Sequence, residues 1–215
     1  MTSLRPIKSG EEVLNYYGAL PSCDLLRRYG YTSEKHRRYD VVELPWDVVQ
    51  KTINEKFSSE VTAKVDEDEL EESFVLERES GDPDETGVNT FPARFNAFPE
   101  ELEEQINLFT ASALRIQLRK LDKVAKQTLR AAYADVIAKA MPARLKQYAT
   151  TIPEDEALLE SKTTTGRLRM AIEVRLGEKR LLQEAQVLAN DLVAKYKQAD
   201  AKSDEPKAKK QKTSR

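Results

Sequence analysis

The second half of the chain is dominated by apolar residues that recur every three or four positions. One series comprises Leu114, Leu118, Leu121, Ala125, Leu129, Ala132 and Val136, and a later one comprises Leu181, Ala185, Leu188, Leu192 and Tyr196. This spacing places side chains on one face of an α-helix. We expect both stripes to face a core rather than to carry function. The sequence therefore predicts a bundle of three or four helices from Phe98 onward.

Prolines delimit these predicted helices. Pro99 is followed at once by four glutamates within five residues, which is typical of a helix start because acids stabilise the positive end of the dipole. Pro142 is expected to end or kink the helix that carries the first series. A short helix should follow Pro153, and the sequence TTTGRL at 163–168 should precede the last helix.

The residues before Phe98 predict a small mixed α/β piece. Residues 39–44, YDVVEL, alternate and are β-branched, so they indicate a strand. Pro45 should then open an amphipathic helix to about Phe57. A further short helix is expected around 24–28 and a short strand at 74–78. The predicted fold class is mainly α, and only 7 glycines in 215 residues agree with it.

Charge excludes several partners. The net charge of −2 gives no global attraction to nucleic acid or membrane, so we expect neither as a direct partner. No apolar run approaches the length of about 20 residues that spans a bilayer. The acidic run at 60–85 is expected to be a solvated loop, with a docking patch for a basic partner as the alternative.

The composition of the C-terminus indicates a disordered basic tail from about residue 200. Within it, KAKKQK at 207–212 fits a nuclear-import signal, and a generic basic tail is an equally open interpretation. The single Cys23 excludes an internal disulfide and indicates a reducing compartment. We therefore expect the protein in the nucleus, the cytoplasm or both.

Several kinds of catalytic site are excluded by residue counts. His36 and Cys23 are each the only residue of their type, so the usual zinc ligand sets cannot form and no metal is expected. No second histidine is available for a Ser-His-Asp triad, and the glycines are too scattered for a phosphate loop.

The remaining feature is a tyrosine-rich stretch near the start of the chain. IKSGEEVLNYYG at 7–18 resembles the closing strand of the SET-domain protein-lysine methyltransferases, in which a Gly-Glu-Glu turn leads to a catalytic tyrosine. CDLLRRYGY at 23–31 resembles an element of the branch that contains the Rubisco large-subunit and ribosomal-protein lysine methyltransferases. Residues 148–185 resemble the end of that branch's helical substrate-binding domain. The positions that carry this last likeness are Arg167, Leu168, Ala171, Ile172, Arg175, Gly177, Glu178 and Lys179.

This resemblance implies a domain division and three site residues. Residues 1–45 would be the incomplete C-terminal end of a SET domain, 46–199 a helical substrate-binding domain, and 200–215 the tail. Tyr17 would be the catalytic tyrosine, Tyr29 would line the substrate-lysine channel, and Tyr31 would pack against the adenine of the cofactor. A buried core tyrosine is the alternative for each of them.

The implied function is S-adenosylmethionine-dependent methylation of a lysine in a protein substrate, with a ribosomal protein as the best guess. The sequence has no Asn-His pair, which the family's cofactor site needs upstream of the Gly-Glu-Glu turn. We therefore expect an incomplete cofactor site, so that this chain alone is inactive. We also expect the protein to be a monomer. The alternative is a non-catalytic helical interaction module. A nucleic-acid binder acting through the basic tail is the weakest hypothesis.

Overall fold

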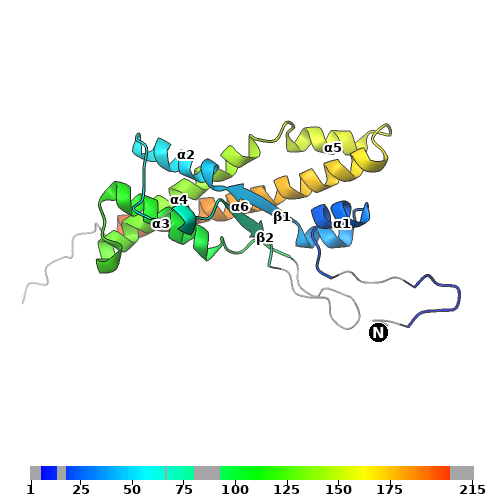
Figure 1. Cartoon of the computed structure of the whole chain (residues 1–215), viewed down its shortest axis with the longest axis horizontal. Helices are drawn as coiled ribbons and strands as arrows, with labels where there is room; N and C mark the ends of the chain where they lie inside the picture. Colours follow the sequence, from blue (N-terminus) through cyan, green and yellow to red (C-terminus); the bar gives the residue numbers. More distant parts are fainter. Residues whose placement is uncertain (1–5, 14–17, 66, 80–92, 204–215) are drawn as a thin grey trace, which may run out of the picture.

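The computed structural model describes residues 6–13, 18–65, 67–79 and 93–203 (Figure 1). In chain order its elements are α1 (Ser22–Tyr29), the 3-10 helix η1 (Glu34–Tyr39), β1 (Val41–Pro45), α2 (Trp46–Phe57), η2 (Glu67–Glu69), β2 (Ser73–Glu77), α3 (Glu100–Leu114), η3 (Leu118–Lys120), α4 (Lys123–Leu145), α5 (Ile152–Glu160) and α6 (Gly166–Ser203). The described part is mainly α with a two-stranded sheet, which confirms the predicted fold class.

Helix α6 is the spine of the molecule. It runs along most of the long axis in Figure 1, and α4, α5, β1 and α1 all pack against it. In the apolar stripe predicted for it, Leu181 and Ala185 are fully buried in the core, and Leu188 and Leu192 are partly buried against it. Other fully buried core side chains come from the remaining elements: Leu44, Val49, Ile53, Leu76, Leu102, Ile106, Ile137 and Met141.

The sheet connects the N-terminal piece to the helical part. Strands β1 and β2 are antiparallel, and Leu44 lies opposite Phe74. Pro45 both ends β1 and caps α2, as its fixed φ of −64° allows. The Trp46 ring packs edge-on against Phe74 and Phe109, with centroid distances of 6.2 and 4.9 Å. This aromatic cluster fixes the sheet on α3.

One sequence prediction about the helices is wrong. The apolar series from Leu114 to Val136 was expected to lie on a single helix, but α3 ends at Leu114, and Arg115 adopts a left-handed φ of 57°. A new helix begins after Asp122, whose carboxylate accepts a 2.7 Å hydrogen bond from the Ala125 N–H. Leu118 is consequently 40% exposed, and only the later members of the series are buried.

The two ends of the long axis differ in content. The N-terminal piece with α1 lies at one end, and the connection from α3 to α4 lies at the other (Figure 1).

Within the described residues, no helix combines the length and apolarity that crossing a bilayer requires. The tail predicted at 200–215 falls mostly outside the described residues, and the domain boundary at residue 45 stays a prediction.

Candidate functional site

Two of the three predicted site residues lie side by side at the end of α1. Gly30 follows the helix with a φ of 77°, and its N–H donates to the carbonyls of Leu25 and Leu26 at 3.1 and 3.0 Å. This turn brings the Tyr29 and Tyr31 rings to a centroid distance of 6.5 Å. The two residues are 44% and 38% exposed, so both are accessible to solvent. Tyr17 lies outside the described residues.

Helix α1 is held in place by a buried side chain and by a hydrogen bond to the residues that follow it. Leu25 is fully buried, and the N–H of Ser22 donates to the Asp40 carboxylate at 3.0 Å. Asp40 is itself buried, and this burial raises the pKa of its carboxyl group, against the opposing effect of the hydrogen bond from Ser22. The tyrosine pair is therefore carried by an anchored helix rather than by a free loop.

The same N-terminal piece is docked on α6. Gly177 of α6 lies against Asp40 so closely that a Cβ there would be 2.3 Å from Oδ2. The Thr32 hydroxyl donates to Glu173 at 2.7 Å, and Arg37 lies 3.8 Å from the same carboxylate. Two turns of α6 thus set the position of the segment that follows the tyrosine pair.

Two further residues of α6, Arg175 and Lys179, bind α5 and the segment before it. Lys179 is 1% exposed and donates to Asp155 at 2.6 Å and to the Thr150 hydroxyl at 3.0 Å. Arg175 donates to the same carboxylate. Burial acts to raise the pKa of Asp155, but the hydrogen bonds from Arg175, Lys179 and Thr150 outweigh it and hold that pKa below its usual value. Asp155 is therefore a charged, fully paired anchor.

Glu178, between Gly177 and Lys179, also binds another part of the chain. It accepts a 2.7 Å hydrogen bond from the Tyr148 hydroxyl. Burial raises the pKa of Glu178 and also that of Tyr148, whose bond to Glu178 raises it further. The run Gly177–Glu178–Lys179, singled out by resemblance, thus joins α6 to the N-terminal piece, to the segment before α5 and to α5 itself.

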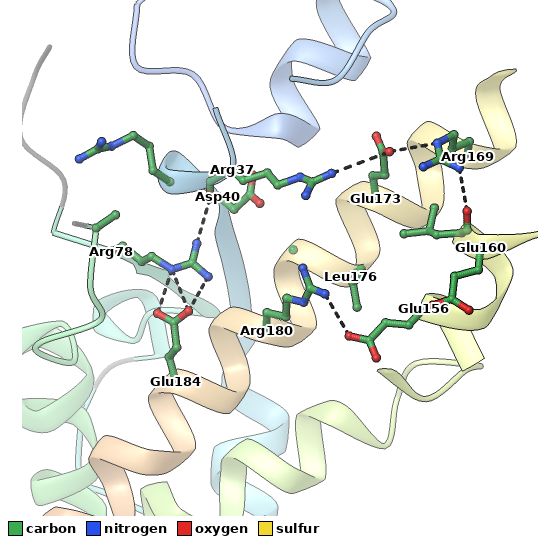
Figure 2. A pocket seen from close by; sticks show the side chains of 14 residues that line it. Arg37, Asp40, Arg78, Glu156, Glu160, Arg169, Glu173, Leu176, Arg180 and Glu184 are labelled. Carbon is green, nitrogen blue, oxygen red and sulfur yellow. Dashed lines mark hydrogen bonds and ion pairs between the residues drawn. The ribbon is translucent and has the colours of Figure 1, made fainter. Parts of the chain in front are cut away.

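A charged cleft of about 730 Å³ opens between the N-terminal piece, β2, α5 and α6 (Figure 2). Three of its arginines are paired with glutamates, two of them across elements and one within α6. Arg78 reaches Glu184 at 2.8 Å, Arg180 reaches Glu156 at 3.0 Å, and Arg169 reaches Glu173 at 3.3 Å. Such a surface suits a polar polypeptide of mixed charge better than a small apolar ligand.

The described residues of this region form hydrogen bonds and ion pairs that position α1, α5 and the N-terminal piece on α6. In the parts of the chain that the structure covers, no group of three or more His, Cys, Asp or Glu side chains could hold a metal ion. Two residues that join the N-terminal piece to α6, Asp40 and Glu173, were not predicted from the sequence. The glycine in the middle of a predicted helix was the available signal, since such a glycine often marks a close approach.

The comparisons with known proteins agree with this architecture. The family model described as Rubisco LSMT substrate-binding matches residues 62–182. The actin-histidine N-methyltransferase of Gallus gallus is 25% identical over 191 residues, which cover 85% of this chain. The ribosomal lysine N-methyltransferase 4 of Saccharomyces cerevisiae is 37% identical over 59 residues, or 27% of this chain.

A solved structure shares the fold. The SET domain of LSMT bound to methyl-lysine and AdoHcy aligns with a TM-score of 0.53 at 17% identity, over 89% of this chain and 43% of that chain. The alignment therefore includes part of the N-terminal piece as well as the helices. This chain spans only 30% of the chicken protein and 12% of the yeast protein.

Proposed function

Because this chain belongs to the Rubisco LSMT substrate-binding family, we propose that it is the C-terminal portion of an S-adenosylmethionine-dependent methyltransferase acting on a lysine of a protein substrate. The observation that carries the proposal is the exposed pair of tyrosines, Tyr29 and Tyr31, at the end of α1. Helix α6 of the substrate-binding domain holds α1 in position. The known structure with the same fold holds methyl-lysine and AdoHcy.

In this proposal the tyrosines form one wall of a lysine channel. Tyr17 is the catalytic tyrosine, whose phenol oxygen would orient the lone pair of the substrate amine. Tyr29 offers a ring face that accommodates a methylated ammonium. Burial against such rings also favours the neutral amine, which is the nucleophile. S-adenosylmethionine would supply the methyl group as an electrophilic sulfonium, and Tyr31 offers its adenine an exposed aromatic face.

The charged cleft would bind the substrate beside the target residue. It lies between the N-terminal piece and the helical domain, so a polypeptide in it would run close to α1 (Figure 2). Its paired arginines and glutamates supply donors and acceptors for both charge signs. A ribosomal protein is the proposed substrate class, supported by the identity to the yeast ribosomal lysine enzyme.

Histidine is a second candidate acceptor. The alignment with an actin-histidine methyltransferase extends over 85% of this chain, whereas that with the lysine enzyme covers 27%. A histidine has an ordinary pKa near 6.5, so its neutral form is available without the desolvation that a lysine needs. A non-catalytic interaction module, with the cleft holding a partner protein, is the alternative from a different class.

The test is a deletion of the encoding gene in its host, followed by mass spectrometry of methyl-lysine and methylhistidine in ribosomal and total protein. We expect methyl-lysine at one protein to disappear and to return with the intact gene. It should not return with Tyr17→Phe, because the phenol oxygen is lost while the ring remains.

Other results separate the alternatives. Loss of methylhistidine instead would replace lysine by histidine as the acceptor. An unchanged methylation pattern would contradict the methyltransferase proposal and favour the interaction module. Full rescue by Tyr17→Phe would contradict the catalytic assignment alone.

A further inference from the structure

The end of the molecule opposite α1 carries a dense group of exposed cations, which we call the basic end. It consists of seven side chains from the α3–α4 connection, the start of α4 and the last third of α6: Arg115, Arg119, Lys120, Lys123, Lys126, Arg130 and Lys195. Within the part of the chain that the structure describes, none of the seven forms a salt bridge.

This differs from the charged cleft at the other end. There, Arg78, Arg169 and Arg180 each lie within 3.3 Å of a glutamate, so that positive charge is locally compensated. The fold thus places seven cations without a salt bridge at one end of the molecule, although the whole chain has a net charge of −2. An uncompensated cluster of this kind produces a local positive potential that attracts polyanions.

A groove of about 460 Å³ lies within the basic end. It is lined by Lys123, Lys126, Gln127, Arg130, Lys195 and Tyr196. The three α4 cations are spaced at i, i+3 and i+7, so they follow one helix face over about 10 Å. The Tyr196 ring is only partly buried, and the Lys195 ammonium lies 5.8 Å from its centroid. The groove therefore combines a line of cations with an aromatic face.

The lining identifies the class of partner. It contains no acid and no Leu, Ile, Val, Phe or Met side chain. An amphipathic protein helix would require a pocket of apolar side chains for its anchor residues, and this groove is walled by the stems of lysine, arginine and Gln127 around one ring. A single-stranded nucleic acid needs what is present, namely cations for its phosphates and an aromatic or guanidinium plane for a base.

We propose that the basic end binds a single strand of RNA, with phosphates on Lys123, Lys126 and Arg130 and a base stacked on Tyr196. The choice of RNA rests on the proposed function, because a ribosomal protein lies against RNA. The sequence after Ser203 contains five further lysines and arginines. The expectation of no direct nucleic-acid contact was based on the net charge of the whole chain. That net charge does not reveal a local group of cations.

The test is fluorescence anisotropy of a fluorescein-labelled 20-nucleotide single-stranded RNA titrated with the full chain, over a range of salt concentrations. The triple variant Lys123→Glu, Lys126→Glu, Arg130→Glu should bind at least about tenfold more weakly at 100 mM salt. Its log–log salt slope should be smaller by about 2, since each phosphate contact on a single strand contributes about 0.7. Tyr196→Phe should bind like the original chain.

The matched control reverses three exposed lysines that line a groove between α2 and α4, Lys51→Glu, Lys139→Glu and Lys146→Glu. It changes net charge equally and should keep most of the affinity. Equal weakening in both triple variants would overturn the site. Polyglutamate binding the basic end as tightly as RNA would overturn the choice of RNA in favour of an acidic protein segment. The assay uses no methyl donor, so its failure leaves the proposed methyl transfer standing.

Discussion

Gly177 shows how a single residue connects the two parts of the molecule. It lies inside α6, where glycine costs about 1 kcal/mol relative to alanine. Its missing side chain leaves space for the Asp40 carboxylate, and a Cβ would lie 2.3 Å from Oδ2 and 3.1 Å from Cγ. Asp40 cannot simply rotate away, because its other oxygen accepts the Ser22 N–H.

We expect Gly177→Ala to lower the free energy of unfolding, because overpacking in a well-packed site costs about 1–3 kcal/mol. This cost should exceed the gain in helix propensity of about 1 kcal/mol. Urea unfolding followed by circular dichroism measures it. In an Asp40→Ala background the same substitution should be neutral or stabilising, since the close contact is gone. An equal loss in both backgrounds would show that the contact with Asp40 is not the cause.

At this scale the sequence identified residues without their partners. Resemblance singled out Gly177, Glu178 and Lys179, but a motif gives no information on which side chains they meet. Their contacts are Asp40, Tyr148 and Asp155, which are distant in the chain. Such pairings arise from the tertiary fold, and neither spacing nor composition encodes them locally.

At the scale of elements, helix starts were predictable where a proline or a cluster of acids marks them. Pro45 and Pro99 cap α2 and α3 as expected. The break between α3 and α4 was missed because apolar residues keep their three-or-four spacing through it. The local signal for the start of α4 was Asp122, because aspartate is favoured at the N-cap of a helix.

The attachment of α5 to α6 depends on one carboxylate. Asp155 is fully buried, and it is the acid that pairs with the nearly inaccessible Lys179. Removing the negative charge would leave a buried ammonium without a counter-charge, which costs about 3–5 kcal/mol. Helix α5 is short, so little other packing would compensate for the loss.

We therefore expect Asp155→Asn to lower the free energy of unfolding by about 3 kcal/mol at pH 7. The pKa of Asp155 is lowered in the folded protein, so its contribution is present above the unfolded value of about 3.9 and is lost as pH falls through the lower folded value. The difference from the original chain should thus be constant between pH 7 and about 5 and should shrink below about 4. Urea titrations at several pH values check this.

Glu156→Gln is the matched control for this prediction. Glu156 is the next residue in α5 and forms an exposed ion pair with Arg180 at 3.0 Å. Exposed pairs contribute little, so this variant should unfold almost like the original chain. If both variants behaved alike, the buried position of Asp155 would not be what stabilises α5 on α6.

For the whole molecule, the sequence predicted the family and the fold class, and the comparisons confirm both. The three-residue site is only partly placed: Tyr29 and Tyr31 come together, Tyr17 lies outside the described residues, and the roles of all three stay predictions. The segregation of charge into a paired cleft and an unpaired basic end could not be read from composition. It results from which helix ends the fold brings to each end of α6.

The relation between the N-terminal piece and the helical part is a question at this same scale. Strand β1 precedes the predicted boundary at residue 45, and β2 follows it, yet the two pair along five residues of each strand. Thr32 and Asp40 also contact α6 directly. These contacts cross the boundary with buried and hydrogen-bonded groups. They are the kind that make two segments unfold cooperatively.

We accordingly expect one unfolding transition for both parts. Trp46, the only tryptophan, is buried between Phe74 and Phe109 and reports on the helical core. Cys23, the only cysteine, is on α1, and burial raises the pKa of its thiol, so its reaction with a thiol reagent should be slow in the folded state. In urea, the fluorescence change of Trp46 and the onset of rapid Cys23 labelling should share one midpoint. Labelling that becomes rapid at clearly lower urea would mean that the N-terminal piece unfolds by itself, and the boundary at residue 45 would then separate two independent units.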